Sequence, residues 1–240
     1  MIGVVAKSPT GERFQLVVPA AGMGTRLGGM GPKALIDLAG KPLLCRTLSR
    51  FEALGLLHTA VIAAPSTHRR EFEEVLTEHF PVARFTLVEG GPERQDSVNN
   101  ALVALDSSTE IVVIHDAARP FVRRESVMAS IEAAAEYGAA TVAIPAIDTI
   151  LVGDRAGFLV ETPERSALWA CQTPQTFRVD VLLEAHRRAK QERQSATDDA
   201  TLVRRMGRNV KLVMGSPLNI KITTPQDLEL ARRIMEGGLV

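Results

Sequence analysis

Cysteine and aromatic residues are scarce in this chain of 240 residues. The two cysteines, Cys45 and Cys171, lie far apart and show no metal-ligand spacing, which excludes a disulfide framework and a cysteine-based metal cluster. We expect both to be reduced thiols in the core. Aromatic residues make up 4% of the chain and hydrophobic residues 45%, so a sizeable core must be filled by aliphatic side chains.

The chain also lacks net charge and long apolar runs. Its 28 basic and 28 acidic residues cancel, so no overall field attracts the protein to nucleic acid or to a membrane surface. No segment approaches the roughly 20 consecutive apolar residues of a membrane span, and residues 1–13 lack the pattern of a signal peptide. We therefore expect a cytoplasmic protein with no nucleic acid or membrane partner, in which any anion site is a local cluster.

Two common phosphate-binding motifs are missing from the glycine-rich stretch at residues 20–33. A P-loop needs Ser or Thr after its Gly-Lys pair, but here Lys33 lies between Pro32 and Ala34. A dinucleotide-binding fingerprint needs glycines that lead directly into a helix, which Pro32 prevents. The sequence thus argues against a P-loop nucleotidase and against a Rossmann cofactor site.

The same stretch nevertheless has the composition of a polyphosphate-binding loop. It follows the apolar run 16–20 and contains Gly22 and further glycines together with Arg26 and Lys33. Glycines let backbone N–H groups approach phosphate oxygens, and the two cations can reach one anion from two sides of the loop. We predict a phosphate site here, with an ordinary mobile surface loop as the alternative.

Short apolar strands alternate with amphipathic helices along most of the chain. Strands that are apolar throughout and separated by helices predict an α/β fold with a mostly parallel sheet covered by helices on both faces. Ligands bind at the carboxyl ends of such strands, so the loops at 20–33, 89–97 and 115–120 should meet in one crevice. We expect strands at 16–20, 59–64, 84–88, 111–115, 139–144, 210–214 and 219–222, and helices at 42–54, 66–80, 96–105, 125–137, 179–192, 198–206 and after Pro225.

Residues 146–162 interrupt this alternation and resemble a β-hairpin with a loose turn. A hairpin of this size has little core of its own and must pack against something. Two arrangements are open: it folds back onto its own domain, or it is an arm that exchanges with a second subunit.

Charged residues follow the apolar strand at 111–115. Asp116 at such a strand end can hold a divalent cation, and Arg119 can supply a fork for phosphate. The alternative is that the two side chains simply pair with each other. We interpret His115 as a strand-end histidine whose hydrogen bonds are satisfied, rather than as a ligand.

Three further segments have both a functional and an ordinary interpretation. Gly91 and Ser97 lie where a helix N-terminus can bind an anion or a base edge, although a helix cap at Asp96 or Ser97 explains the same residues. Lys221 lies on an expected apolar strand, where it either meets a charged ligand or extends to solvent. The acidic pair at 198–199 is interpreted mainly as a helix cap.

Taken together, these segments resemble the 2-C-methyl-D-erythritol 4-phosphate cytidylyltransferase family, in matching order and over nearly everything after residue 14. The resemblance implies a Rossmann-like nucleotidyltransferase domain over 14–240, with a dimerisation arm at about 146–170 and an N-terminal extension at 1–13. It also implies that CTP and methylerythritol phosphate give CDP-methylerythritol and pyrophosphate in isoprenoid precursor biosynthesis, with Mg²⁺ and a homodimer joined through the arm. The matching segments are Pro19-Ala20-Ala21-Gly22, Arg26, Pro32-Lys33, Glu93-Arg94-Gln95-Asp96-Ser97, His115-Asp116-Ala117-Ala118-Arg119-Pro120, Thr173-Pro174-Gln175, Thr197-Asp198-Asp199-Ala200 and Asn219-Ile220-Lys221.

The resemblance assigns roles by position. Arg26 and Lys33 match the transition-state stabilisers, and Asp116 matches the aspartate that contacts metal and nucleotide. The residues matching the acceptor site are Arg119, Thr149, Arg165, Thr173 and Lys221, with Arg165 supplied by the partner's arm; those matching the cytosine site are Ala20, Ala21, Gly22, Gly91 and Ser97. The chain departs from the family at Leu27, Ala34, Pro217 and Leu218, and the last two can alter how Lys221 is positioned.

The expected chemistry needs no protein nucleophile, because the acceptor phosphate is itself anionic near neutral pH. Two alternatives are a ribitol 5-phosphate cytidylyltransferase, which would share the nucleotide motifs, and a non-catalytic nucleotide-binding protein. Thr149, Arg165 and Thr173 favour the methylerythritol phosphate enzyme over the first. The joint presence of charged residues in several loops favours an enzyme over the second.

Overall fold

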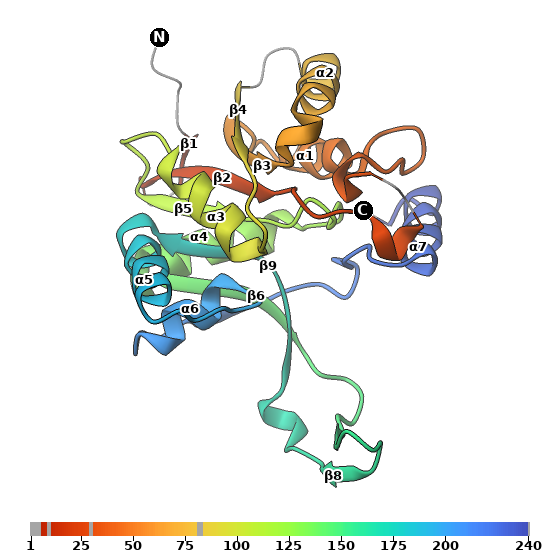
Figure 1. The fold of residues 1–240 in the computed structure, drawn as a ribbon, viewed down its shortest axis with the longest axis vertical. Helices are drawn as coiled ribbons and strands as arrows, with labels where there is room; N and C mark the ends of the chain where they lie inside the picture. The colour runs from red at the N-terminus through yellow and green to blue at the C-terminus, as the bar shows by residue number, and fades with distance from the viewer. Residues whose placement is uncertain (1–5, 9–10, 29–30, 81–83, 240) are drawn as a thin grey trace.

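An eight-stranded sheet runs through the centre of the protein (Figure 1). In this computed structural model, which describes residues 6–8, 11–28, 31–80 and 84–239, the strands follow the order β10-β6-β9-β5-β2-β3-β4, and β1 pairs with β2. Neighbouring strands are parallel, except that β9 is antiparallel to β5 and β6, and β1 to β2. The strands are β1 (Ala6–Lys7), β2 (Arg13–Pro19), β3 (Thr59–Ala64), β4 (Arg84–Glu89), β5 (Ile111–Ile114), β6 (Ala139–Pro145), β9 (Trp169–Arg178) and β10 (Lys211–Met214).

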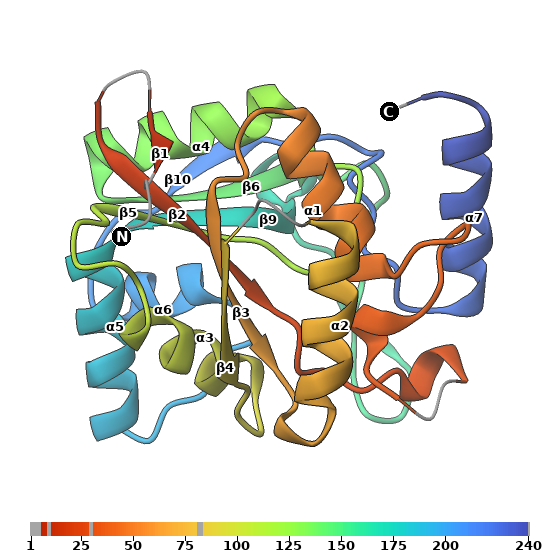
Figure 2. The same cartoon turned by 90° about the horizontal axis from the view of Figure 1, so that it is seen from above.

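Helices cover both faces of this sheet, as the sequence predicts. Buried residues of α1, α2 and α4 pack on one face, and those of α3, α5 and α6 pack on the other; Figure 2 shows α4 and α5 on opposite sides. The α/β class and the mostly parallel sheet are therefore confirmed. The helices are α1 (Leu43–Ala53), α2 (Arg69–His79), α3 (Arg94–Val103), α4 (Arg124–Tyr137), α5 (Val179–Gln191), α6 (Asp199–Arg205) and α7 (Pro225–Glu236), with short 3₁₀ helices at Thr25–Leu27, Lys33–Leu35, Ser66–His68 and Arg165–Ala167.

The two-residue alternation of β2 explains how one apolar strand serves two cores. Leu16 and Val18 belong to the cluster under α1, α2 and α4, whereas Val17 belongs to the cluster under α3, α5 and α6, because successive side chains point to opposite faces of a sheet. A third cluster anchors the loops beside the carboxyl end of the sheet. It includes Phe121 of the loop after β5, Ile222 of the segment before α7, and Ile234 of α7.

The largest element that the sequence pattern does not predict is β9. It lies between β5 and β6, antiparallel to both, and its middle carries the polar residues Gln172, Thr173, Gln175 and Thr176, all buried. Their hydrogen bonds within the protein make this burial possible. The register with β6 shifts opposite Pro174, where proline has no N–H to give to the ladder. Polar side chains and a proline thus conceal a central strand.

The expected strand at 219–222 is wrong. Asn219–Ile222 forms no ladder in the structure; the Ile222 N–H instead donates to the Ala118 carbonyl at 2.9 Å. This segment is a loop held beside the strand-end loop of β5, so Lys221 comes from a loop and not from a sheet edge. The N-terminal extension also contributes a strand that the sequence analysis does not predict. This strand, Ala6–Lys7, pairs antiparallel with β2.

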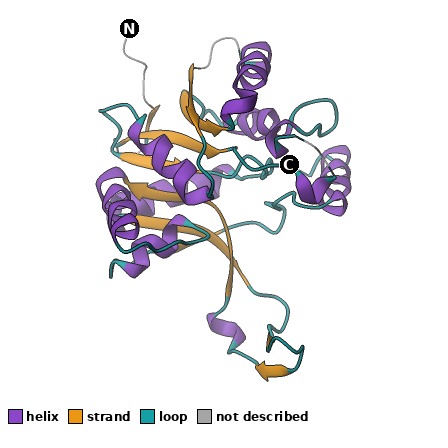
Figure 3. Cartoon of the chain, in the orientation of Figure 1, coloured by secondary structure: helices purple, strands orange, loops and turns teal. Residues whose placement is uncertain are grey.

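The hairpin consists of β7 (Val152–Gly153) and β8 (Leu159–Glu161), paired antiparallel. Figures 1 and 3 show that it projects away from the sheet and its helices. The arrangement in which it folds back onto its own domain is therefore wrong. Its apolar side chains are exposed, with Phe158 at 71% and Val160 at 64%.

Among the described residues, no helix combines the length and hydrophobicity that crossing a lipid bilayer requires.

Candidate active site

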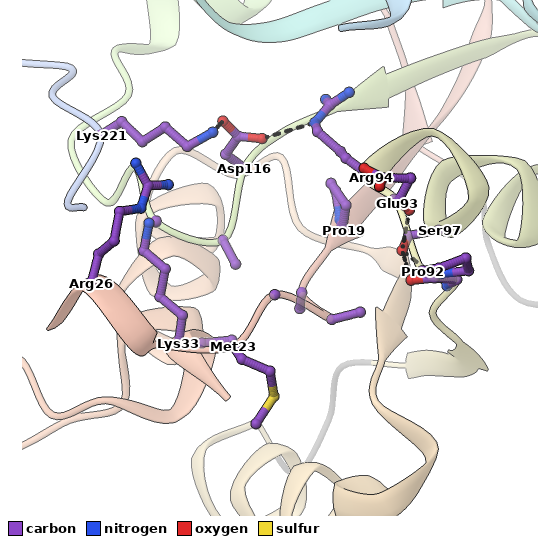
Figure 4. A pocket seen from close by; sticks show the side chains of 17 residues that line it. Pro19, Met23, Arg26, Lys33, Pro92, Glu93, Arg94, Ser97, Asp116 and Lys221 are labelled. Carbon is purple, nitrogen blue, oxygen red and sulfur yellow. Dashed lines mark hydrogen bonds and ion pairs between the residues drawn. The ribbon is translucent and has the colours of Figure 1, made fainter. Parts of the chain in front are cut away.

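A cavity of about 320 Å³ lies at the carboxyl ends of β2, β4 and β5 (Figure 4). The loops at 20–33, 89–97 and 115–118 meet there, as the strand-end rule predicts, and Lys221 joins them from the segment after β10. Nine of the residues proposed from the sequence line this cavity: Ala20, Ala21, Gly22, Arg26, Lys33, Gly91, Ser97, Asp116 and Lys221.

The glycine loop is tied into a narrow hairpin-like turn. The Gly24 N–H donates to the Gly31 carbonyl and the Lys33 N–H to the Gly22 carbonyl, both at 2.9 Å. A Cβ atom on Gly24 would lie 2.9 Å from Ile36 Cδ1 and 3.3 Å from the Gly31 carbonyl oxygen, so a side chain here fits only if Ile36 and the loop shift slightly. The loop carries Arg26 and Lys33 on its two sides, and Figure 4 shows both side chains directed the same way. Residues 29–30 lie outside the described residues.

Asp116 lies at the centre of a cluster of cations. Its carboxylate is 2.8 Å from Lys221 Nζ, 3.4 Å from Arg94 Nε and 3.5 Å from Arg119 Nε, with a side chain only 10% exposed. Burial raises the pKa of this carboxyl, but Arg94, Lys221 and Arg119 together hold the pKa well below its usual range. Asp116 is therefore ionised. The alternative pairing with Arg119 does occur, within a larger network.

Lys33 is also electrostatically perturbed. Burial lowers its pKa to about 8, assisted by Lys221 and Arg26 and opposed by Asp116 and Asp227. A partly desolvated ammonium surrounded by other cations gains more from an anion than a solvated lysine does. The cavity thus concentrates positive charge where a polyphosphate would neutralise it.

This perturbation gives a pH dependence. Lys33 is charged below its pKa of about 8 and neutral above it, so we expect kcat/KM for the nucleotide to fall about tenfold between pH 7 and pH 9. A steady-state pH profile checks this. In Lys33→Arg the guanidinium stays charged, so this decline should disappear even if overall activity is lower. An identical decline in that variant would assign the titration to another group.

The wall of the cavity opposite the cations is formed by two loops, and glycine lets these loops lie close together. A Cβ atom on Gly90 would lie 2.2 Å from Ala21 Cβ, so the loop after β4 and the loop after β2 meet only because this position is glycine. The Gly91 N–H donates to Ser97 Oγ at 3.1 Å. The helix cap predicted at Asp96 or Ser97 is instead Glu93, which forms a capping box with Asp96. The Ser97 hydroxyl in turn donates to the Glu93 carbonyl at 3.2 Å, so this wall is held by hydrogen bonds of its own.

Two residues that the sequence reasoning did not assign hold this network. Arg94 lines the cavity, and its NH1 is 2.6 Å from Asp199 Oδ2; the other oxygen of Asp199 is 3.1 Å from His186 Nε2. The capping interpretation is right for Asp198, which accepts from the Thr201 N–H, but Asp199 is 1% exposed and pairs across the fold. The sequence did offer one signal. A helix cap needs only one acidic residue, so the second of the two adjacent aspartates, Asp199, called for another role.

The remaining proposed residues lie outside the cavity, in two places. Arg119 and Thr173 are buried beneath it; NH1 of Arg119 donates to the Asn219 carbonyl at 2.7 Å, so the guanidinium also supports the loop that carries Lys221. Thr149 and Arg165 are exposed and belong to the projecting arm, where Arg165 NH1 donates to the Ile147 carbonyl at 2.9 Å. Their acceptor-binding roles stay predictions.

His115 is fully buried, and its ring nitrogens lie 2.9 Å from the Arg119 carbonyl oxygen and 3.0 Å from Thr173 Oγ1. Burial lowers its pKa to about 4. The interpretation of His115 as a satisfied strand-end histidine is therefore confirmed.

Comparison with known proteins gives one consistent result. Residues 14–237 match the family model of 2-C-methyl-D-erythritol 4-phosphate cytidylyltransferase. The chain is 43% identical to the protein of that name from Pelotomaculum thermopropionicum, over 94% of this chain and 95% of the relative. It is 45% identical to the one from Symbiobacterium thermophilum, over 92% of each chain.

Solved structures agree with these sequence relationships. The crystal structure of 2-C-methyl-D-erythritol 4-phosphate cytidylyltransferase from Thermus thermophilus superposes with a TM-score of 0.76 at 35% identity, covering 92% of this chain and 98% of that one. The 4-diphosphocytidyl-2C-methyl-D-erythritol synthase from Anaerococcus prevotii superposes with a TM-score of 0.81 at 26% identity, covering 94% and 99%. The similarity thus extends over nearly the whole chain.

Proposed function

Since this chain belongs to the 2-C-methyl-D-erythritol 4-phosphate cytidylyltransferase family, we propose that it converts CTP and 2-C-methyl-D-erythritol 4-phosphate to CDP-methylerythritol and pyrophosphate in isoprenoid precursor biosynthesis. The observation that carries the proposal is the convergence of Arg26, Lys33 and Lys221 on one cavity beside an ionised Asp116. Such a cavity suits the transfer of a nucleotidyl group between two anions. We also propose that the protein acts in the cytoplasm, because both proposed substrates are water-soluble.

In this reaction an oxygen of the acceptor phosphate attacks the α-phosphorus of CTP. A new phosphorus–oxygen bond forms, the bond to the β-phosphate breaks, and pyrophosphate leaves with the electron pair. The acceptor phosphate is already anionic, so the protein needs to supply alignment and counter-charge rather than a base. Arg26 and Lys33, on the two sides of the glycine loop, can neutralise the charge that develops on the triphosphate.

Mg²⁺ belongs to the proposal as a cofactor that enters with the nucleotide. Among the described residues, no group of three or more His, Cys, Asp or Glu side chains could hold a metal alone. One carboxylate in a phosphate-binding cavity nevertheless fits Mg²⁺, which commonly binds one or two carboxylates together with substrate phosphates and water. Asp116 would hold the ion, and a bound Mg²⁺ supplies Lewis-acid neutralisation of the phosphates.

We also propose a homodimer joined through the arm. Its exposed apolar side chains, including Phe158, Leu159 and Val160, would be costly to leave in water but are suited to burial in an interface. Arg165 and Thr149 lie in this arm, outside the cavity of their own chain, which supports their delivery to the partner's site.

CTP should be preferred over UTP and ATP as the nucleotide. The close-packed wall at Ala21, Gly90 and Ser97 offers backbone and hydroxyl groups that distinguish an exocyclic amine from a carbonyl, and an unmatched buried polar edge costs about 1 to 3 kcal/mol, or roughly 5- to 150-fold in kcat/KM. Pyrophosphate release, measured with each nucleotide and methylerythritol phosphate, checks this. Equal rates with all three nucleotides would contradict base recognition.

The alternatives considered for this sequence make different demands. A ribitol 5-phosphate cytidylyltransferase would keep the nucleotide side and change the acceptor side, and the family relationships do not favour it. A non-catalytic nucleotide-binding protein would release no pyrophosphate.

A further inference from the structure

His115 and Thr173 form a hydrogen-bonded pair directly beneath Asp116. His115 follows β5 and is 0% exposed, and Thr173 is a buried residue of β9. The histidine ring also packs edge-on against Phe51, with ring centroids 5.0 Å apart. Neither side chain lines the cavity, yet both connect to the turn that carries its central carboxylate.

The direction of every hydrogen bond in this pair is fixed by chemistry. The Arg119 carbonyl oxygen can only accept, so His115 Nε2 must carry the hydrogen in their 2.9 Å contact. In the neutral ring Nδ1 is then an acceptor, and the Thr173 hydroxyl donates to it at 3.0 Å. The same hydroxyl accepts from the Asp116 N–H at 3.1 Å. One unbroken chain of hydrogen bonds thus runs from the Asp116 N–H to the Arg119 carbonyl.

These bonds hold the turn 116–119 at both ends. The Arg119 N–H donates to the Asp116 carbonyl at 3.1 Å and closes the turn, while Thr173 and His115 hold the N–H of its first residue and the carbonyl of its last. The Thr173 carbonyl also accepts from Asn219 Nδ2 at 2.8 Å, which connects the same strand to the loop of Lys221. The Asp116 carboxylate and its partner Lys221 are therefore supported by one residue of β9.

We propose that His115 and Thr173 are positioning residues, which orient the Asp116 carboxylate toward Lys221 at the cavity. Their effect on turnover rests on the cytidylyl transfer proposed above. Thr173 then acts through Asp116, because its hydroxyl accepts from the Asp116 N–H and donates its only hydrogen to His115.

The test compares Thr173→Val, which removes the hydroxyl at nearly constant shape, with Thr173→Ser, which keeps it. Misplacement of a group at the reacting centre can cost about 10²-fold, so we expect Thr173→Val to lower kcat roughly 10- to 100-fold with little change in KM for methylerythritol phosphate. Thr173→Ser should stay within about threefold of wild type. Thr176→Val is the matched control: Thr176 is another fully buried threonine of β9, but its hydroxyl contacts Ser130 Oγ at 2.8 Å instead. This control should lose stability without a comparable loss of kcat.

A double-mutant cycle then separates positioning from substrate contact. If the pair acts as one unit, His115→Gln combined with Thr173→Val should lower kcat about as much as the worse single variant, and not by the product of the two losses. Multiplying losses, or a Thr173→Val variant whose KM for the acceptor rises while kcat is unchanged, would overturn the proposal and return Thr173 to the acceptor site.

A structural readout keeps the inference separate from the proposed function. Crystal structures of wild type and Thr173→Val should show the 2.8 Å contact between Asp116 and Lys221 kept in the first and lost in the second. This comparison holds even if the wild-type protein releases no pyrophosphate, a result that would count against cytidylyl transfer alone. An unmoved Asp116 carboxylate in Thr173→Val would refute positioning.

Discussion

Replacing Lys33 by alanine is expected to lower kcat by roughly 10² to 10³-fold, the usual loss when one preorganised donor to a transition state is removed. Lys33 reaches the cavity from a loop whose turn is closed by backbone hydrogen bonds, including its own N–H to the Gly22 carbonyl. These bonds do not use the side chain, so the loop should keep its conformation. Its burial among other cations means that the ammonium gains most when phosphate charge develops beside it.

The measurement is single-turnover and steady-state kinetics of Lys33→Ala, with Lys41→Ala as the control. Lys41 follows the same loop, but its Nζ donates to Ser49 Oγ at 3.2 Å and lies outside the cavity, so its removal should leave kcat within about threefold of wild type. The catalytic role would be refuted by a Lys33→Ala variant whose kcat is unchanged and whose KM alone is raised.

Mixing two defective proteins, Lys33→Ala and Arg165→Ala, is expected to restore activity. Arg165 begins the short 3₁₀ helix Arg165–Ala167 of the arm and does not line the cavity of its own chain. If Arg165 makes the proposed charge-assisted hydrogen bond to the acceptor phosphate, its loss should cost about 1.5 to 3 kcal/mol, roughly 10- to 150-fold in kcat/KM for the acceptor. The assay is therefore run at an acceptor concentration well below the raised KM.

In a symmetric dimer that binds each acceptor with the partner's arm, a mixed dimer regains one site with Lys33 and Arg165 both intact. Random exchange makes about half of the dimers mixed, so activity should return to roughly a quarter of wild type. A mixture of Lys33→Ala with Arg26→Ala is the control, because both residues belong to the same loop and no exchange can reunite them. Arg165 serves its own chain, or no site, if subunits demonstrably exchange and activity stays low.

Apolar periodicity was enough to predict the α/β architecture, because β3 and β5 are nearly continuous runs of aliphatic residues and β2 contains the shorter run 16–18. It failed at β9, where Gln172, Gln175 and neighbouring polar residues are buried by hydrogen bonding rather than by hydrophobicity. It also failed at 219–222, where Ile220 and Ile222 alternate like a strand but pack as a loop against α7 and the turn after β5. A pattern of hydrophobicity indicates which residues are buried, but it does not identify the element against which they pack.

The candidate site was predictable where charge stands out against its surroundings. Arg26, Lys33 and Asp116 lie in glycine-rich or strand-end loops, and the structure brings them to one cavity. Arg94 and Asp199 were not assigned, because each lies beside residues that an ordinary helix cap explains and their contact joins positions far apart in the chain. Long-range pairing of this kind is a property of the tertiary structure, which a single sequence does not display.

The most direct test of the central claim is pyrophosphate release from CTP and Mg²⁺ with two acceptors in parallel, methylerythritol phosphate and ribitol 5-phosphate. The account predicts release that depends on methylerythritol phosphate, equals the CDP-methylerythritol formed, and exceeds the rate with ribitol 5-phosphate by at least about tenfold in kcat/KM. Faster release with ribitol 5-phosphate, or none with either acceptor, would contradict it.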